Sequence, residues 1–137
     1  IDSIKSFKKE FLVGIHIRKG GKLPSGEKLS NVIKKIEKYK PIGIIVSCVS
    51  IEHVNEVMND FKKIKVPYGF KINAFEHIPA GWKPDSNNPK VQLGKRKDLT
   101  PTKFAKTCIK FNNMGANILG GCCEISPSHI KKLKTLM

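Results

Sequence analysis

Three cysteines are the residues in this sequence whose types and spacing could do chemistry. Cys122 and Cys123 stand side by side after Gly120 and Gly121, and adjacent cysteines do not readily pair with each other because so small a ring strains the disulfide. Both thiols can instead face one metal ion where a strand turns into a loop, since glycines let the backbone turn tightly. Thiolate ligands indicate zinc, at a sulfur–metal distance of roughly 2.3 Å. Two ligands do not complete a site, so a third must come from elsewhere.

The elements that must position these thiols alternate between short apolar segments and amphipathic segments. We predict strands at 11–17, 42–46, 66–72 and 116–119, and helices at 27–39, 51–63, 101–113 and from 127 onward, after the end of a helix at 2–10. Strands that are apolar on both faces and alternate with helices are typical of a parallel sheet covered by helices. The 137 residues therefore predict one α/β domain, either doubly wound or part of a (β/α)8 TIM barrel.

Cys48 follows the second predicted strand, as Cys122 and Cys123 follow the fourth. The carboxyl ends of parallel strands lie at one edge of the sheet, so we expect the three sulfurs to converge, at separations near the roughly 4 Å that tetrahedral thiolate ligands require. Three thiolates leave one coordination position open, which favours a catalytic zinc over a structural zinc or free thiols. Cys108 lies on the apolar side of a predicted helix, where we expect a core residue.

In these residues and their placement, the chain resembles the C-terminal half of the homocysteine S-methyltransferase family, a family of zinc-dependent (β/α)8 barrels. The resemblance is carried most specifically by 115–123 with 127–130, and further by 41–48, Asn73-Ala74, Leu99-Thr100-Pro101, Phe104-Ala105 and the helix start at Gly26-Glu27. It implies that Cys48, Cys122 and Cys123 hold Zn2+ and that the sulfur of homocysteine takes the fourth position. A methyl donor of unidentified kind would then convert homocysteine to methionine.

The resemblance also assigns strands five to eight of the barrel to this chain. The first four strands, with an acidic Asp-Gly segment that helps to hold the amino acid in the family, have no counterpart here, and the sequence begins at Ile1. We therefore expect residues 1–137 to form a partial, half-barrel domain with lateral edges at 11–17 and 116–119. Such a half needs an N-terminal half-barrel or a second copy as partner, because exposed strand edges invite association.

Two functions follow, and the sequence leaves both open. One is the methyl transfer that the family performs; the alternative is a non-catalytic half-barrel remnant, or a partner-binding subunit that needs the missing N-terminal half. Two positions depart from the family pattern, since Ser47 stands where asparagine is common and Phe75 where glycine is common. Asn73, which follows the third predicted strand, either lines the substrate site or makes a hydrogen bond within its loop.

None of the four histidines has zinc-ligand spacing with the cysteines. We expect His53 and His129 to be exposed near helix starts. His77 lies in a long irregular stretch, 76–99, and is the histidine that could approach the site, because long loops often carry functional residues. His16 has no assigned role.

The sequence carries a large positive charge, with 26 Lys and Arg against 11 Asp and Glu and a formal net charge of +15. Most of the cations are lysines dispersed along predicted helices, without an RNP-like aromatic motif, a helix-turn-helix signature or Cys/His finger spacing. This pattern favours a solvated surface over specific nucleic-acid binding. No apolar run approaches the roughly 20 residues that cross a membrane, and four cysteines favour a reducing compartment, so we expect a cytoplasmic protein.

Overall fold

The computed structural model of the chain describes residues 9–79 and 93–137. Four strands form one parallel sheet in chain order: β1 (Leu12–Ile15), β2 (Gly43–Val49), β3 (Tyr68–Ile72) and β4 (Ile118–Gly121). The predicted α/β class with four strands is confirmed. Most of the helix end expected at 2–10, and the middle of the irregular stretch at 76–99, lie outside the described residues.

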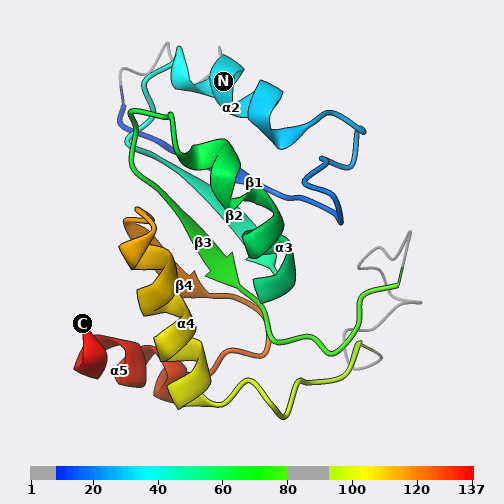
Figure 1. Cartoon of the computed structure of the whole chain (residues 1–137), viewed down its shortest axis with the longest axis vertical. Helices are drawn as coiled ribbons and strands as arrows, with labels where there is room; N and C mark the ends of the chain where they lie inside the picture. The colour runs from blue at the N-terminus through cyan, green and yellow to red at the C-terminus, as the bar shows by residue number, and fades with distance from the viewer. Residues whose placement is uncertain (1–8, 80–92) are drawn as a thin grey trace.

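The connections between the strands carry the helices α2 (Leu29–Glu37), α3 (Ile51–Val57) with the 3-10 turn η1 (Met58–Phe61), and α4 (Pro101–Asn113), and α5 (Pro127–Leu136) follows β4. Crossovers between parallel strands are almost always right-handed, so a sheet built in chain order places its helices on one face. Figure 1 shows α3 and α4 over the same face of the sheet. A doubly wound sheet reverses its strand order and carries helices on both faces, so this topology favours the half-barrel alternative.

The hydrophobic core lies between the sheet and these helices. Ile44 and Val46 of β2, with Phe70 and Ile72 of β3, face the helices and are fully buried. The Phe70 ring packs against Phe61 of η1 and a phenylalanine of α4 at position 111, with centroid distances of 5.6 and 5.7 Å. Because burying each such side chain contributes about 1.5–3 kcal/mol, this face of the sheet holds the fold together.

Side-chain caps begin two of the helices. The Ser50 hydroxyl accepts a hydrogen bond from the backbone N–H of His53 at the start of α3. The Thr100 hydroxyl accepts one from the backbone N–H of Lys103 at the start of α4, where Pro101 occupies the first turn. Each cap satisfies an N–H group that has no partner within its helix. The helices that follow the strands therefore begin at defined positions.

The prediction that His129 is exposed is wrong, because its side chain is only 5% exposed. Its Nδ1 accepts a hydrogen bond from the backbone N–H of Ser126, and Nε2 lies 2.9 Å from the carbonyl oxygen of Leu99. The ring also packs edge-on against Phe104. His129 thus turns back over the start of α5 and joins it to the start of α4. His53 is half-buried rather than exposed.

Strand boundaries also differ from the prediction by a few residues. β2 continues past Val46 to Val49 and so includes Cys48, and β4 begins at Ile118 and reaches Gly121. The predicted helix at 51–63 changes from α to 3-10 geometry after Val57. Apolar runs locate strands well, but hydrogen bonds to neighbouring strands decide where each one ends.

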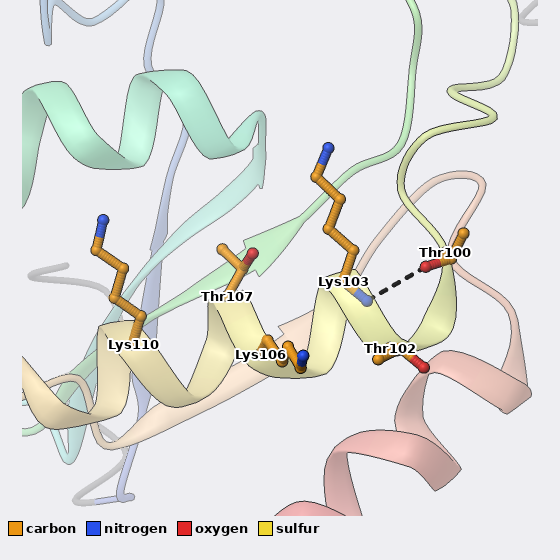
Figure 2. Close-up of a pocket in the computed structure, with 6 residues that line it drawn as sticks. All are labelled: Thr100, Thr102, Lys103, Lys106, Thr107 and Lys110. Atoms are coloured by element: carbon orange, nitrogen blue, oxygen red, sulfur yellow. Dashed lines mark hydrogen bonds between the residues drawn. The ribbon is translucent and has the colours of Figure 1, made fainter.

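The lysines of α4 behave as a solvated surface. Figure 2 shows Lys103, Lys106 and Lys110 standing off α4 around a shallow hollow that also involves three threonines, at positions 100, 102 and 107. All of these residues belong to one helix and its cap, so the hollow brings together no groups from separate elements. None of the described helices combines the length and the apolarity that crossing a membrane requires.

Candidate metal centre

Cys48 reaches the edge of the sheet through an irregularity in β2. The pairing of β2 with β3 shifts register between Ser47 and Val49, so Cys48 is an extra residue that has no partner on β3. Its φ angle is +54°, in the left-handed region that residues with a Cβ rarely adopt. Bulges of this kind redirect a side chain, and backbone strain of about 1–3 kcal/mol is found mainly where a functional geometry requires it. The irregularity therefore sets the direction of the Cys48 thiol.

Cys122 and Cys123 are held against the end of β3 by backbone hydrogen bonds. The Cys122 N–H donates to the carbonyl oxygen of Ile72 over 2.7 Å, and the carbonyl oxygen of Cys123 accepts from the Ala74 N–H over 2.9 Å. These bonds continue the β3–β4 pairing beyond the last residue of each strand. The two cysteines thus lie on an ordered extension of the sheet, directly after Gly121.

The three sulfurs converge, as predicted. Cys48 Sγ lies 3.8 Å from Cys123 Sγ, Cys122 Sγ lies 3.8 Å from Cys123 Sγ, and all three sulfurs lie within 4.8 Å of one another. A tetrahedral ion with sulfur ligands at 2.3 Å requires sulfur separations of about 3.8 Å. The three thiols therefore fit one zinc ion. Among the described residues, this cluster is the group of three or more Cys, His, Asp or Glu side chains whose ligand atoms lie close enough together to share one ion.

The environment separates the acidities of the thiols. Burial, and after it the neighbouring thiols of Cys122 and Cys123, raise the pKa of Cys48 to about 12. Burial also opposes ionisation of Cys122, but hydrogen bonds from Cys48 and Cys123 and the positive charge of Lys71 lower the pKa of Cys122 below its ordinary value. Without metal, Cys122 is therefore easier to ionise than Cys48, and the Cys48 thiol donates to Cys123 Sγ.

Asn73, the residue directly after β3, supports the cluster. Its side chain is 1% exposed, its Nδ2 lies 3.7 Å from Cys48 Sγ as a donor, and its Oδ1 accepts a hydrogen bond from the Phe75 N–H over 3.3 Å. The hydrogen bond within the loop, one of the two roles that the sequence left open, is confirmed, and the other end of the amide contacts a candidate metal ligand. Donors of this kind orient the ligands of a metal.

The other residues considered from sequence lie outside the cluster. Cys108 is fully buried in the core, as predicted, and burial raises the pKa of its thiol to about 12. His77 is exposed, and neither it nor His16 belongs to the candidate ligand group. His16 Nδ1 lies 3.4 Å from the Ser47 carbonyl oxygen.

The segment after residue 92 is more regular than the sequence suggests. It pairs antiparallel with the residues that follow β3, through the bridge of Phe75 with Lys95 and a hydrogen bond from the Arg96 N–H to the Ala74 carbonyl oxygen. The Arg96 guanidinium then bonds Glu52 and Asp98, at 2.8 and 2.9 Å. Ala74 also holds Cys123, so this segment supports the candidate site. A local sequence pattern cannot predict this antiparallel pairing, because the paired residues lie about twenty positions apart in the chain.

Comparison with known proteins agrees with this geometry. Two curated relatives, each named Homocysteine S-methyltransferase 1, from Arabidopsis thaliana and from Brassica oleracea var. italica, are 25% identical to the chain over 121 residues. The alignments cover 83% of this chain and 33% of each relative, so the chain spans about a third of the length of these relatives. The model of the family described as homocysteine S-methyltransferase matches residues 1–137. The chain belongs to the homocysteine S-methyltransferase family.

Proposed function

We propose that this chain carries the zinc site of an enzyme that transfers a methyl group to the thiol of homocysteine and so forms methionine. The observation that supports this function is the convergence of Cys48, Cys122 and Cys123 at the carboxyl edge of a parallel sheet, in a chain that belongs to the methyltransferase family. These cysteines would hold zinc through three sulfurs and leave its fourth position for the substrate sulfur. When bound, zinc would keep a thiol substrate in its deprotonated form at neutral pH.

The residues of the chain prepare the site for this chemistry in three ways. The cysteine sulfurs present a preformed triangle, so little rearrangement accompanies loading. The Asn73 amide orients Cys48 from one side, while the backbone bonds to Ile72 and Ala74 hold the other two cysteines. The substrate thiolate then attacks the methyl carbon of the donor; the new S–CH3 bond forms as the bond to the leaving group breaks, and that group keeps the electron pair.

The wider setting of the enzyme belongs to the same proposal. Residues 1–137 act as a single half-barrel domain, and an N-terminal half-barrel or a second copy completes the substrate site. Free thiols function in a reducing compartment, so we place the protein in the cytoplasm. The intact sulfur triangle supports this role over that of a non-catalytic remnant, because a remnant retains no reason to hold three thiols at zinc-ligand distances.

Metal analysis of the purified chain tests the proposal most directly, because all three ligands come from this chain. We expect about one zinc per chain, and a cobalt-substituted form whose visible spectrum changes when homocysteine is added, since the added sulfur enters the coordination sphere. Methyl transfer is then assayed with the barrel completed, with S-methylmethionine, S-adenosylmethionine, betaine and methylfolate offered in turn. A chain that binds no metal would support the remnant instead.

A further inference from the structure

Lys71 is the one charged residue in the four described strands. It lies in β3, which is paired with a strand on each side. Parallel strands inside a sheet normally consist of apolar residues throughout, because both of their faces are covered. A lysine there is costly to cover, because a buried ammonium group needs a partner of opposite charge. The position of Lys71 therefore calls for a function other than packing.

Lys71 belongs to a row of residues on the face of the sheet away from the helices. Ser47 of β2 and Gly120 of β4 are its register partners, and His16, directly after β1, contacts the Ser47 carbonyl oxygen. Phe70 and Ile72, on either side of Lys71, are fully buried against the helices, whereas Lys71 is exposed. Lys71 thus points toward the side where the interior of a barrel would lie.

The same face leads directly to the cysteines. Asn73 lies two residues further along the chain on the Lys71 face, about 7 Å toward the carboxyl edge, and its amide contacts Cys48. A lysine side chain is long enough to bring its charge close to the metal centre.

The space around Lys71 suits a ligand with a negative charge. None of the ion pairs among the described residues includes Lys71, and the four strands contain no acidic residue. Its register partner Gly120 has no side chain, and a Cβ placed there would lie 3.9 Å from Lys71 Cγ. The sheet therefore leaves room beside the aliphatic part of the Lys71 side chain, close to the carboxyl edge where the three sulfurs lie.

We propose that Lys71 binds the carboxylate of the amino-acid substrate while the substrate sulfur occupies the open position at the three cysteines. This inference rests on the proposed function, and it adds a specificity residue to it. An ammonium–carboxylate pair in a partly enclosed site is a strong, charge-assisted interaction. It would let the enzyme distinguish a thiol amino acid from thiols that lack a carboxylate.

The test compares two thiols in the cobalt-loaded full chain: homocysteine and 3-mercaptopropylamine, which is the same molecule without its carboxylate. Binding of each is followed by the change in the visible cobalt spectrum. We expect homocysteine to bind about 10- to 100-fold more tightly than the amine, the range that one charge-assisted bond supplies. In Lys71→Met we expect this preference to fall to about twofold or less, whereas Lys71→Arg should retain most of it.

Lys106→Met is the matched control, because Lys106 stands on α4 (Figure 2), which covers the opposite face of the sheet. It should leave both affinities unchanged. If both thiols perturb the spectrum and Lys71→Met keeps the full preference, the carboxylate role is refuted while thiol capture stands. Loss of cobalt uptake in Lys71→Met also refutes it, since the main role of Lys71 would then be to offset the charge of the thiolates rather than to bind the substrate carboxylate. If neither thiol perturbs the spectrum, thiol capture fails and the inference fails with it.

Discussion

At the scale of single residues, the metal centre consists of thiols that differ in how readily they ionise. Hydrogen bonds and the charge of Lys71 lower the pKa of Cys122 in spite of its burial, whereas burial raises the pKa of Cys48. Metal ligands must be deprotonated, so zinc loading has to displace the Cys48 proton. The apparent zinc affinity of the chain should therefore rise with pH in the range of about 6 to 8.

This difference predicts the order in which the thiols react in the metal-free protein. Because the thiolate is the nucleophile, we expect iodoacetamide at about pH 7 to modify Cys122 before Cys48, and Cys108 last, since it is fully buried. Peptide mass spectrometry over a time course measures the order. Saturation with zinc should slow modification of both Cys122 and Cys48. Modification of Cys48 ahead of Cys122 would contradict the assigned pKa directions.

A second prediction separates the ligand cysteines from the core cysteine. Cys48→Ser should abolish zinc retention, and with it methyl transfer by the completed enzyme, because a serine hydroxyl is a poor zinc ligand at neutral pH. Cys108→Ser should keep one zinc per chain and lower the free energy of unfolding by about 1–3 kcal/mol, since it places a hydroxyl in the core. Metal analysis and denaturant unfolding measure the two effects. Equal zinc loss in both variants would show that the roles are wrongly assigned.

The sequence predicts the ligand residues well but their surroundings poorly. Adjacent cysteines after two glycines, and another cysteine after a strand, are local signals, and parallel topology brings them together. The contact of Asn73 with Cys48 and the placement of Lys71 depend on which face of β3 each residue occupies. That face becomes known only when the register of β3 with its neighbours is known, because a shift of one residue exchanges the faces.

At the scale of elements, the turn after β4 sets the position of two ligands. A Cβ atom at Gly121 would lie only 2.7 Å from Ile125 Cβ, which is close to the backbone of the loop and cannot move away easily. Gly120 has no such restriction, since its nearest neighbour would be Lys71 Cγ at 3.9 Å. The second glycine of the pair is therefore required by packing, and the first is not.

This contrast predicts different outcomes for two otherwise similar substitutions. Gly121→Ala should lower the free energy of unfolding by about 1–3 kcal/mol, the usual cost of overpacking, and should weaken zinc binding because the cysteine loop must shift. Gly120→Ala should fold normally and bind zinc with unchanged stoichiometry. Thermal unfolding and metal titration of both variants measure the difference. Equal stability of the two proteins would mean that the loop adapts freely around position 121.

The elements themselves are largely predictable from sequence, whereas their ends are less so. Apolar periodicity identifies each described strand and helix, and Ser50 and Thr100 mark helix starts by their capping chemistry. The bulge at Cys48 could not be predicted, because it arises from the register between β2 and β3. The burial of His129 was missed for a similar reason, since its partner Leu99 lies thirty residues away.

At the scale of the whole molecule, one face and two edges of the sheet lack cover in the described residues. β1 and β4 are the outer strands of the sheet, as predicted, and each pairs with a strand on one side only. On the face away from the helices, the side chains of Leu12 and Ile118 both occupy the space beside Gly43, and Leu12 is 51% exposed. Parallel sheets are normally covered on both faces, so this surface fits the interior of a larger barrel.

The last prediction follows from these open surfaces. Unpaired backbone groups on β1 and β4 favour pairing with further strands, and the exposed apolar side chains add to that tendency. We therefore expect residues 1–137, expressed alone, to form dimers or larger species in light scattering, at concentrations where an ordinary domain of this size is monomeric.

We also expect no methyl transfer to homocysteine from the isolated chain, because part of the substrate site lies outside it. The isolated chain should still bind zinc, because all three sulfurs belong to it. Addition of a polypeptide that supplies an N-terminal half-barrel should restore both a defined mass and activity. A monodisperse monomer with full activity would show that this half of the sheet is sufficient for folding and catalysis.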